Sequence, residues 1–178
     1  MSRTRLLLVL VNVVGGVAVL GSYALGITAH ADSVPALWGQ IPEAWRPMYT
    51  VSMFLAAAGY LTFGPYLLFR VHPDTTRLAG GLAFGWLVLP FLLILGPSAL
   101  WMSLTFRFAE SGLQSDWMAV RLALGLVALG SLLLLWMLVG LRPRVHPRHW
   151  ALSIVGAAAF LFQTGVLDAL VWAGFYRG

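Results

Sequence analysis

Long apolar runs alternate with short polar segments along the whole chain. An α-helix needs about 20 predominantly apolar residues to cross the hydrocarbon core of a bilayer. Five runs are long enough, at residues 6–28, 49–69, 78–100, 117–141 and 150–175. Backbone groups in lipid must bond within their own segment, so these runs form helices and not strands. The pattern predicts an all-α polytopic membrane protein in which residues 1–178 form a single integral membrane domain, a bundle of five transmembrane helices.

Composition supports the membrane assignment and excludes a water-soluble domain. Of the 178 residues, 60% are hydrophobic and 10% are charged, whereas a soluble domain carries about 25% charged residues. No cysteine is present, which excludes disulfides and thiolate metal sites. All positive side chains other than histidine are arginine, as in GC-rich coding sequences, so we expect a bacterial cytoplasmic membrane protein. The arginines lie at the ends of apolar runs, which indicates membrane topology and no nucleic-acid partner.

The distribution of arginine predicts how the chain is threaded. Seven arginines fall in the N-terminal segment and in the second and fourth connections, namely Arg3, Arg5, Arg70, Arg77, Arg142, Arg144 and Arg148. The remaining connections and the C-terminus hold three, namely Arg46, Arg107 and Arg177. Cytoplasmic segments carry the excess of arginine, so we expect a cytoplasmic N-terminus and an extracytoplasmic C-terminus. The two longer connections, 29–48 and 101–116, would then lie outside.

Two charged residues lie inside predicted helices, where charge is costly and often functional. Arg121 lies near the outer end of the fourth helix, and Asp168 lies in the outer half of the fifth. A short connection joins these helices, so we expect the two charges to meet at a similar depth. They would form a structural ion pair or the polar floor of an outward-facing pocket; alternatively, Arg121 reaches the headgroups and Asp168 faces water. Gln163, deeper in the fifth helix, is expected to bond a neighbouring helix.

The first connection contains the stretch "LWGQIPEAWRPMYT" at residues 37–50. Pro42 can open a short helical turn and Pro47 can begin the second helix, because proline suits the first turn. Glu43 and Arg46 are three residues apart, a spacing that favours a weak surface ion pair. Four residues are candidates for a lid over a pocket or for an interface: Trp38, Trp45, Arg46 and Tyr49.

Motifs for chemistry are largely missing. The sequence contains neither G-x-S-x-G nor H-E-x-x-H, so an enzyme is the less favoured class. No histidine lies deep in a predicted helix, so nothing indicates a mid-membrane haem. His72, His146 and His149 are weak candidates for a metal site at the cytoplasmic edge. The cofactor stays unknown; the deeper Trp86 and Trp136 are compatible with a bound lipid or pigment.

Five short helices and a tryptophan-rich first connection resemble, in outline, the tryptophan-rich sensory protein family, which binds porphyrins and sterols. The nearest matches are Pro42, Trp45 and Pro47. The family's W-T-x-L-Y run in the second helix is replaced here by "AAAGYLTFG". The resemblance covers architecture and a few residues of the connection, so it implies no particular site residues.

Two functions therefore stand side by side. The first is a non-catalytic accessory or scaffold subunit of a larger membrane complex, with the bilayer and other membrane subunits as partners. Faces of small residues, such as Ala18, Ser22 and Gly26, favour it because they allow helices to approach closely. The alternative is a lipid-, pigment- or small-molecule-binding protein, or a transporter, with an outward-facing pocket near Arg121 and Asp168.

Overall fold

The computed structural model describes residues 2–176, and this part of the chain is helical. The long helices are α1 (Arg3–Ala29), α2 (Arg46–Pro65), α3 (Val88–Ser111), α4 (Gln114–Val139) and α5 (Pro147–Leu161). The fifth continues through the π-helical segment η6 (Phe162–Trp172) into α6 (Ala173–Phe175). Five continuous helices within the described residues are long and apolar enough to cross a membrane. The predicted helical class and the number of membrane-length helices are confirmed.

Shorter helical pieces fill the connections. Between α1 and α2 lie η1 (Ala31–Trp38) and η2 (Glu43–Trp45). The π-helical segment η3 (Tyr66–Arg70) extends α2, and η4 (Ala79–Gly81) and η5 (Phe84–Leu87) precede α3. As predicted, Pro42 immediately precedes a short helical turn, and Pro47 lies in the first turn of α2.

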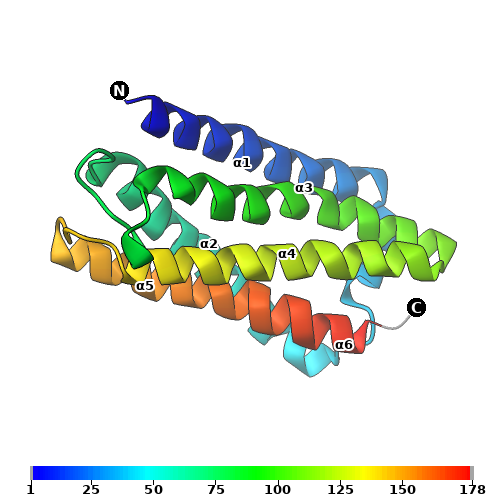
Figure 1. Cartoon of the computed structure of the whole chain (residues 1–178). Helices are drawn as coiled ribbons and strands as arrows, with labels where there is room; N and C mark the ends of the chain where they lie inside the picture. Colours follow the sequence, from blue (N-terminus) through cyan, green and yellow to red (C-terminus); the bar gives the residue numbers. More distant parts are fainter. Residues whose placement is uncertain (1, 177–178) are drawn as a thin grey trace.

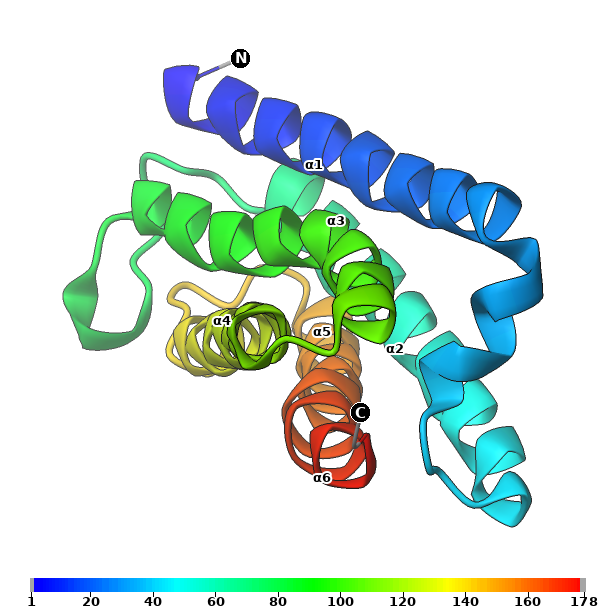
Figure 2. The same ribbon diagram turned by 90° about the vertical axis from the view of Figure 1, so that its right-hand side faces the viewer.

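The helices do not pack in the order of the sequence. α1 packs against α3, α3 against α4, α4 against α5 and η6, and α5 against α2. In Figure 1, α1, α3, α4 and α5 run roughly alongside one another, and α2 passes behind them at an angle. Figure 2 shows α1 at the edge of the bundle beside α3, with α4 and α5 seen nearly end-on. Two helices that are consecutive in sequence, α1 and α2, therefore have different main partners.

The contact between α2 and α5 depends on two glycines. A Cβ atom built on Gly59 would collide with the carbonyl oxygen of Gly156, and one on Gly156 would collide with Thr62 Oγ1. Ser153 Oγ donates a hydrogen bond to the Thr62 carbonyl across the same contact at 3.3 Å. Small residues allow helix backbones to approach closely, which strengthens van der Waals packing in a membrane protein.

The third helix lies further along the sequence than predicted. Together with the turn η5 it forms one continuous helix, Phe84–Ser111, whereas the apolar run indicated residues 78–100. Residues 71–83 form the connection before it, and some of their side chains enter the core; Val71 is fully buried and Leu78 is 2% exposed. Only Gly112 and Leu113 separate α3 from α4. The prediction of a long connection at residues 101–116 is therefore wrong. A longer connection lies instead between η3 and the third helix.

Arginines gather at one end of the bundle, which we call the arginine-rich end (Arg3, Arg5, Arg70, Arg77, Arg142, Arg144 and Arg148). The N-terminus and the connections before α3 and α5 lie together on the left of Figure 1. Arg77 and Arg142 exchange two backbone hydrogen bonds of 2.8 Å, and Arg5 Nη2 donates to the Val71 carbonyl at 2.5 Å. The predicted meeting of these segments at one end is thus seen.

The opposite end is rich in aromatic side chains, and we call it the aromatic end. Its buried residues are Ile41, Tyr49, Phe108, Val120, Leu124, Leu167, Trp172 and Tyr176, with Trp38, Trp101 and Trp117 packed against them. A second core, which includes Leu8, Phe63, Leu67, Phe91, Ile94, Leu134 and Leu138, fills the half toward the arginine-rich end. Arg177, expected outside the membrane, lies beyond the described residues.

Candidate functional site

A carboxylate and an amide lie side by side within the last membrane-length helix. Gln163 Nε2 donates a hydrogen bond to Asp168 Oδ1 at 2.7 Å. An α-helix has 3.6 residues per turn, so residues five apart ordinarily lie on different faces. Both residues belong to η6, whose i→i+5 backbone bonding makes wider turns and brings positions 163 and 168 to one side. The π-helical segment therefore creates this pair.

Two buried polar atoms in this half of the bundle, Gln163 Oε1 and Trp101 Nε1, have no hydrogen-bond partner within residues 2–176. Gln163 is 4% exposed, and its Oε1 atom is buried and unpaired. The indole Nε1 of Trp101 is likewise buried and unpaired. Asp168 is partly buried and, among the described residues, its carboxylate accepts the Gln163 bond but belongs to no ion pair. Buried polar groups are normally satisfied, so these atoms call for an explanation.

Aromatic side chains pack around this part of the last helix. The Tyr49 hydroxyl donates a hydrogen bond to the carbonyl of Leu167, the residue before Asp168, at 3.1 Å. Tyr23 packs edge-on against Trp101 at 6.2 Å between ring centroids, and Trp101 packs on Trp172 at 5.6 Å. These side chains come from α1, α2, α3 and η6. We call Tyr23, Tyr49, Trp101, Gln163, Asp168 and Trp172 the polar–aromatic cluster.

The connection between α1 and α2 folds over the aromatic end and is fastened to the last helix. Trp172 Nε1 donates a hydrogen bond to the Leu37 carbonyl at 2.9 Å. Gly39 has a positive φ of 53°, and a Cβ atom there would collide with the Tyr176 ring. Burial raises the pKa of the Tyr176 phenol, which follows the last membrane-length helix, so the hydroxyl stays neutral. This connection thus has a fixed position beside the polar–aromatic cluster.

The candidate residues of the first connection divide into two groups. Tyr49 is 2% exposed, and its hydroxyl donates to the Leu167 carbonyl at 3.1 Å. Trp38 packs edge-on against Tyr49 at 6.3 Å and lies under the Arg46 guanidinium. Trp45 is 43% exposed and touches Phe175 at the surface. Arg46 pairs with Glu43 at 3.7 Å, which confirms the expected weak surface pair.

The structure does not bring Arg121 and Asp168 into an ion pair. Arg121 is exposed on α4, and the three ion pairs found within residues 2–176 do not include it. Asp168 turns instead to Gln163 on its own helix. Gln163 therefore does not bond a neighbouring helix as expected; the bond between α4 and the last helix is made by Thr164 and Ser131, at 2.9 Å.

Two polar contacts were not anticipated from the sequence. Asp116, at the start of α4, accepts hydrogen bonds from Arg107 and from Ser111 Oγ, the latter at 2.6 Å, and so locks the turn between α3 and α4. Tyr60 on α2 donates to Asn12 Oδ1 on α1 at 2.5 Å. For the second contact, the sequence shows only that Tyr60 and Asn12 are polar residues inside apolar runs. This does not indicate that they bond each other.

The other candidates for chemistry are not assembled into sites. His72, His146 and His149 are exposed at the arginine-rich end, and within the described residues no group of three or more potential ligands could hold a metal ion. The His146 and His149 rings lie 5.8 Å apart. Trp86 and Trp136 are 54% and 48% exposed. They therefore cover the outside of the bundle and do not line its interior.

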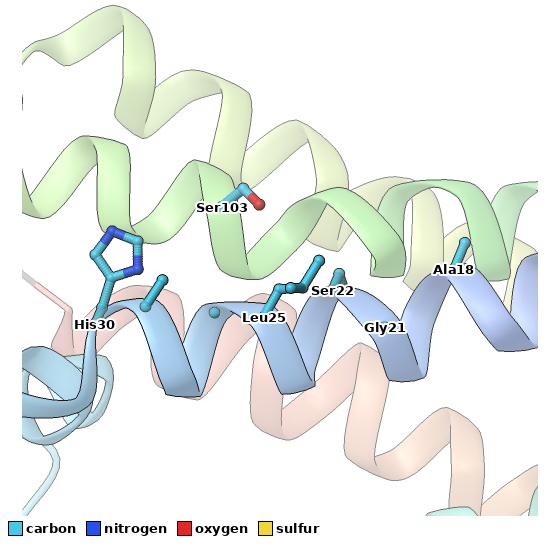
Figure 3. A pocket seen from close by; sticks show the side chains of 8 residues that line it. Ala18, Gly21, Ser22, Leu25, His30 and Ser103 are labelled. Atoms are coloured by element: carbon cyan, nitrogen blue, oxygen red, sulfur yellow. The ribbon is translucent and has the colours of Figure 1, made fainter.

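A second feature is an open groove between α1 and α3. Its lining residues are mostly small or apolar: Ala18, Gly21, Ser22, Leu25, Gly26, Ala29, His30 and Ser103. Figure 3 shows this row of residues along α1 with Ser103 contributed by the neighbouring helix. The His30 imidazole stacks on Phe106 at 4.3 Å and closes the groove at the aromatic end.

Comparison of the chain with protein families, curated proteins and solved structures finds no match. The function must therefore be argued from the residues themselves.

Proposed function

We propose that this chain is an integral membrane protein that binds a small organic molecule at the polar–aromatic cluster. The observation that carries the proposal is the pair of Asp168 and Gln163, which lies in a membrane-length helix beside buried, unpaired polar atoms. Ionisable residues at such positions are costly and usually mark binding or transport pathways. A bound molecule would supply the missing partners.

Three features of the fold support this assignment. The cluster draws side chains from four different helices, as binding sites within helix bundles do. The π-helical turn that aligns Gln163 with Asp168 belongs to a class of distortion often found at functional sites. The connection held by Trp172 and Leu37 lies beside the cluster, where it would limit access of water.

Membrane insertion and orientation form part of the same proposal. The seven arginines at one end support a cytoplasmic location for that end, since cytoplasmic segments carry excess arginine. The aromatic end, with the cluster closer to it, would then face outward. We place the protein in a bacterial cytoplasmic membrane on the same composition argument as above.

Native mass spectrometry of protein purified in mild detergent tests the proposal. Wild-type protein is expected to retain a non-phospholipid small molecule, or to gain thermal stability from members of a small-molecule library. Gln163→Leu removes the amide whose Oε1 lacks a partner and should abolish that gain, whereas Gln114→Leu at the exposed start of α4 should not. Wild-type protein with no bound molecule and no stabilising compound would contradict the proposal.

Function as an accessory subunit is the second candidate, and α1 favours it. This helix packs mainly on α3 and exposes large apolar residues along its length, including Val17 at 67% and Leu20 at 72%. Beside them runs the groove of Figure 3, whose small residues would admit a partner helix.

Filling the groove separates this candidate from simple contact with lipid. Gly21→Leu places a large side chain where a Cβ meets no atom within 4 Å, so the fold should persist. A partner subunit that copurifies with wild-type protein should be lost from this variant. Gly125→Leu, at an equally open position on α4, is the matched control and should retain the partner. Purification of wild-type protein without any stoichiometric partner would argue against the accessory role.

A further inference from the structure

We propose that the molecule bound at the polar–aromatic cluster is a protonated amine carried on an apolar or aromatic body. This inference rests on the proposed binding function and specifies its ligand class. Three observations support it: the polar atoms of the cluster that have no hydrogen-bond partner, the carboxylate of Asp168, and the aromatic rings of the cluster.

The leftover atoms nearest the carboxylate are acceptors. An ionised carboxylate only accepts hydrogen bonds, so Gln163 must turn its NH₂ group toward Asp168 and its Oε1 away. Oε1 then has no donor within residues 2–176. Asp168 Oδ2 also receives no hydrogen bond from these residues. Gln163 Oε1 and the second Asp168 oxygen are both acceptors, and an ammonium group offers up to three N–H bonds.

The charge at the cluster selects a cation. No ion pair within the described residues includes Asp168, so its negative charge has no partner there. In a medium of low dielectric constant such a charge strongly attracts a cation and repels an anion. A phosphate or carboxylate ligand would meet like charge at this position. The arginines in the same half of the bundle are engaged or exposed elsewhere: Arg46 pairs with Glu43, Arg107 pairs with Asp116, and Arg121 is exposed on α4.

The walls of the cluster fit the remainder of such a ligand. The faces of Trp and Tyr attract cations, with Trp giving the strongest interaction. Trp101 and Trp172 pack on each other at 5.6 Å between ring centroids, and Tyr23 packs on Trp101 at 6.2 Å, so three rings adjoin one another, one of them on the helix that carries Asp168. Their apolar surfaces would pack on the hydrocarbon part of the ligand. The indole N–H of Trp101, also unpaired, could bond an acceptor on that part.

Three probes of nearly equal shape test the inference. 2-Phenylethylamine is a cation and a donor at neutral pH, 2-phenylethanol is a neutral donor, and propylbenzene has neither property. Binding of each to purified full-length protein is measured by calorimetry and by thermal shift. The wild type should bind the amine at least about tenfold more tightly than the alcohol, a ratio that corresponds to about 1.4 kcal/mol. Propylbenzene should bind most weakly.

Two matched variants test whether the preference for the amine depends on Asp168. Asp168→Asn keeps the shape and the bond to Gln163, and it should remove the preference for the amine. Asp32→Asn removes an exposed carboxylate from the connection at the same end and should leave the preference intact. Retention of the cluster fold in Asp168→Asn is checked by equal binding of 2-phenylethanol to the variant and the wild type.

Two results would overturn the inference while leaving the proposed function standing. One is equal or tighter binding of the alcohol by the wild type, as expected if Asp168 were a neutral acid bonded to Gln163. The other is identification of the copurified molecule as neutral or anionic. Absence of any bound molecule, together with no binding of any probe, would instead overturn both the inference and the proposed function.

Discussion

The two halves of the helix bundle are built from different kinds of contact. Toward the arginine-rich end, fully buried side chains such as Phe63, Leu67 and Phe91 pack together, and α2 touches α5 through glycine backbones. Toward the aromatic end, indoles and phenols pack together, and the last helix carries a carboxylate and the unpaired Gln163 Oε1 within its membrane-length span. Charged groups inside the bilayer are costly. We therefore expect the first half to hold the fold together and the second to give up stability at the proposed binding site.

The strongest test of this comparison is Gly156→Ala. The added methyl group would collide with Thr62 Oγ1 and with the Gly59 backbone, which cannot move without separating α2 from α5. We expect a loss of about 1–3 kcal/mol in the free energy of unfolding, measured by denaturant titration in mild detergent. Gly125→Ala meets no atom within 4 Å and serves as the control. Equal stability of the two variants would refute the role assigned to the glycine contact.

The opposite sign is expected for Asp168→Asn in ligand-free protein. The substitution removes a charge from a membrane-length helix but keeps an acceptor for Gln163 Nε2. Because charged residues are costly inside the bilayer, we expect stability to rise by on the order of 1 kcal/mol. Reconstituted vesicles are the medium for this measurement. A loss of similar size would show that the carboxylate supports the fold, and would erase the contrast between the halves.

A smaller effect is expected where a polar contact is satisfied. Tyr60→Phe removes the hydroxyl that donates to Asn12 between α1 and α2. Hydrogen bonds between membrane helices contribute about 0.6 kcal/mol on average, so a loss of that size is expected. A double-mutant cycle with Asn12→Ala isolates the pair, since the second substitution should add little once the hydroxyl is gone. Fully additive losses would show that the two side chains are not coupled.

The smallest effect is expected at the surface of the aromatic end. Trp45 is 43% exposed and touches Phe175 from outside, so Trp45→Ala should change the free energy of unfolding by less than about 0.5 kcal/mol. Binding of 2-phenylethylamine should also be unchanged, because Trp45 lies outside the polar–aromatic cluster. A loss of amine binding in this variant would extend the site to the surface and assign Trp45 to a lid.

The number of membrane-length helices could be read from the sequence because length and apolar content suffice for it. The position of the third helix could not. Val71, Leu78 and Ala79 have the composition of membrane residues, yet they belong to a connection that folds into the core, where burial demands the same composition. At the other end of α3, Arg107 extends the helix by bonding Asp116 of α4, a partner that hydropathy does not reveal.

The candidate site was only partly predictable. Asp168 and Gln163 stood out because charged and amide groups are rare in apolar runs. Their direct bond could not be foreseen, since it depends on the π-helical turn, and an α-helical spacing would separate them. Arg121 was the expected partner on grounds of depth alone, but depth does not determine which face of α4 a side chain occupies.

The packing partners of the helices also determine the order in which the helices can assemble during synthesis. α2 leaves the ribosome directly after α1, but its main packing partner is α5, which follows α3 and α4 in the sequence. The Leu37 carbonyl likewise has no donor from Trp172 until that residue has been translated. The first connection and the second helix therefore reach their final contacts only after α5 and η6 have been made. Truncated chains that stop before α5 would expose the glycine face of α2 to lipid and to the quality-control proteases of the membrane.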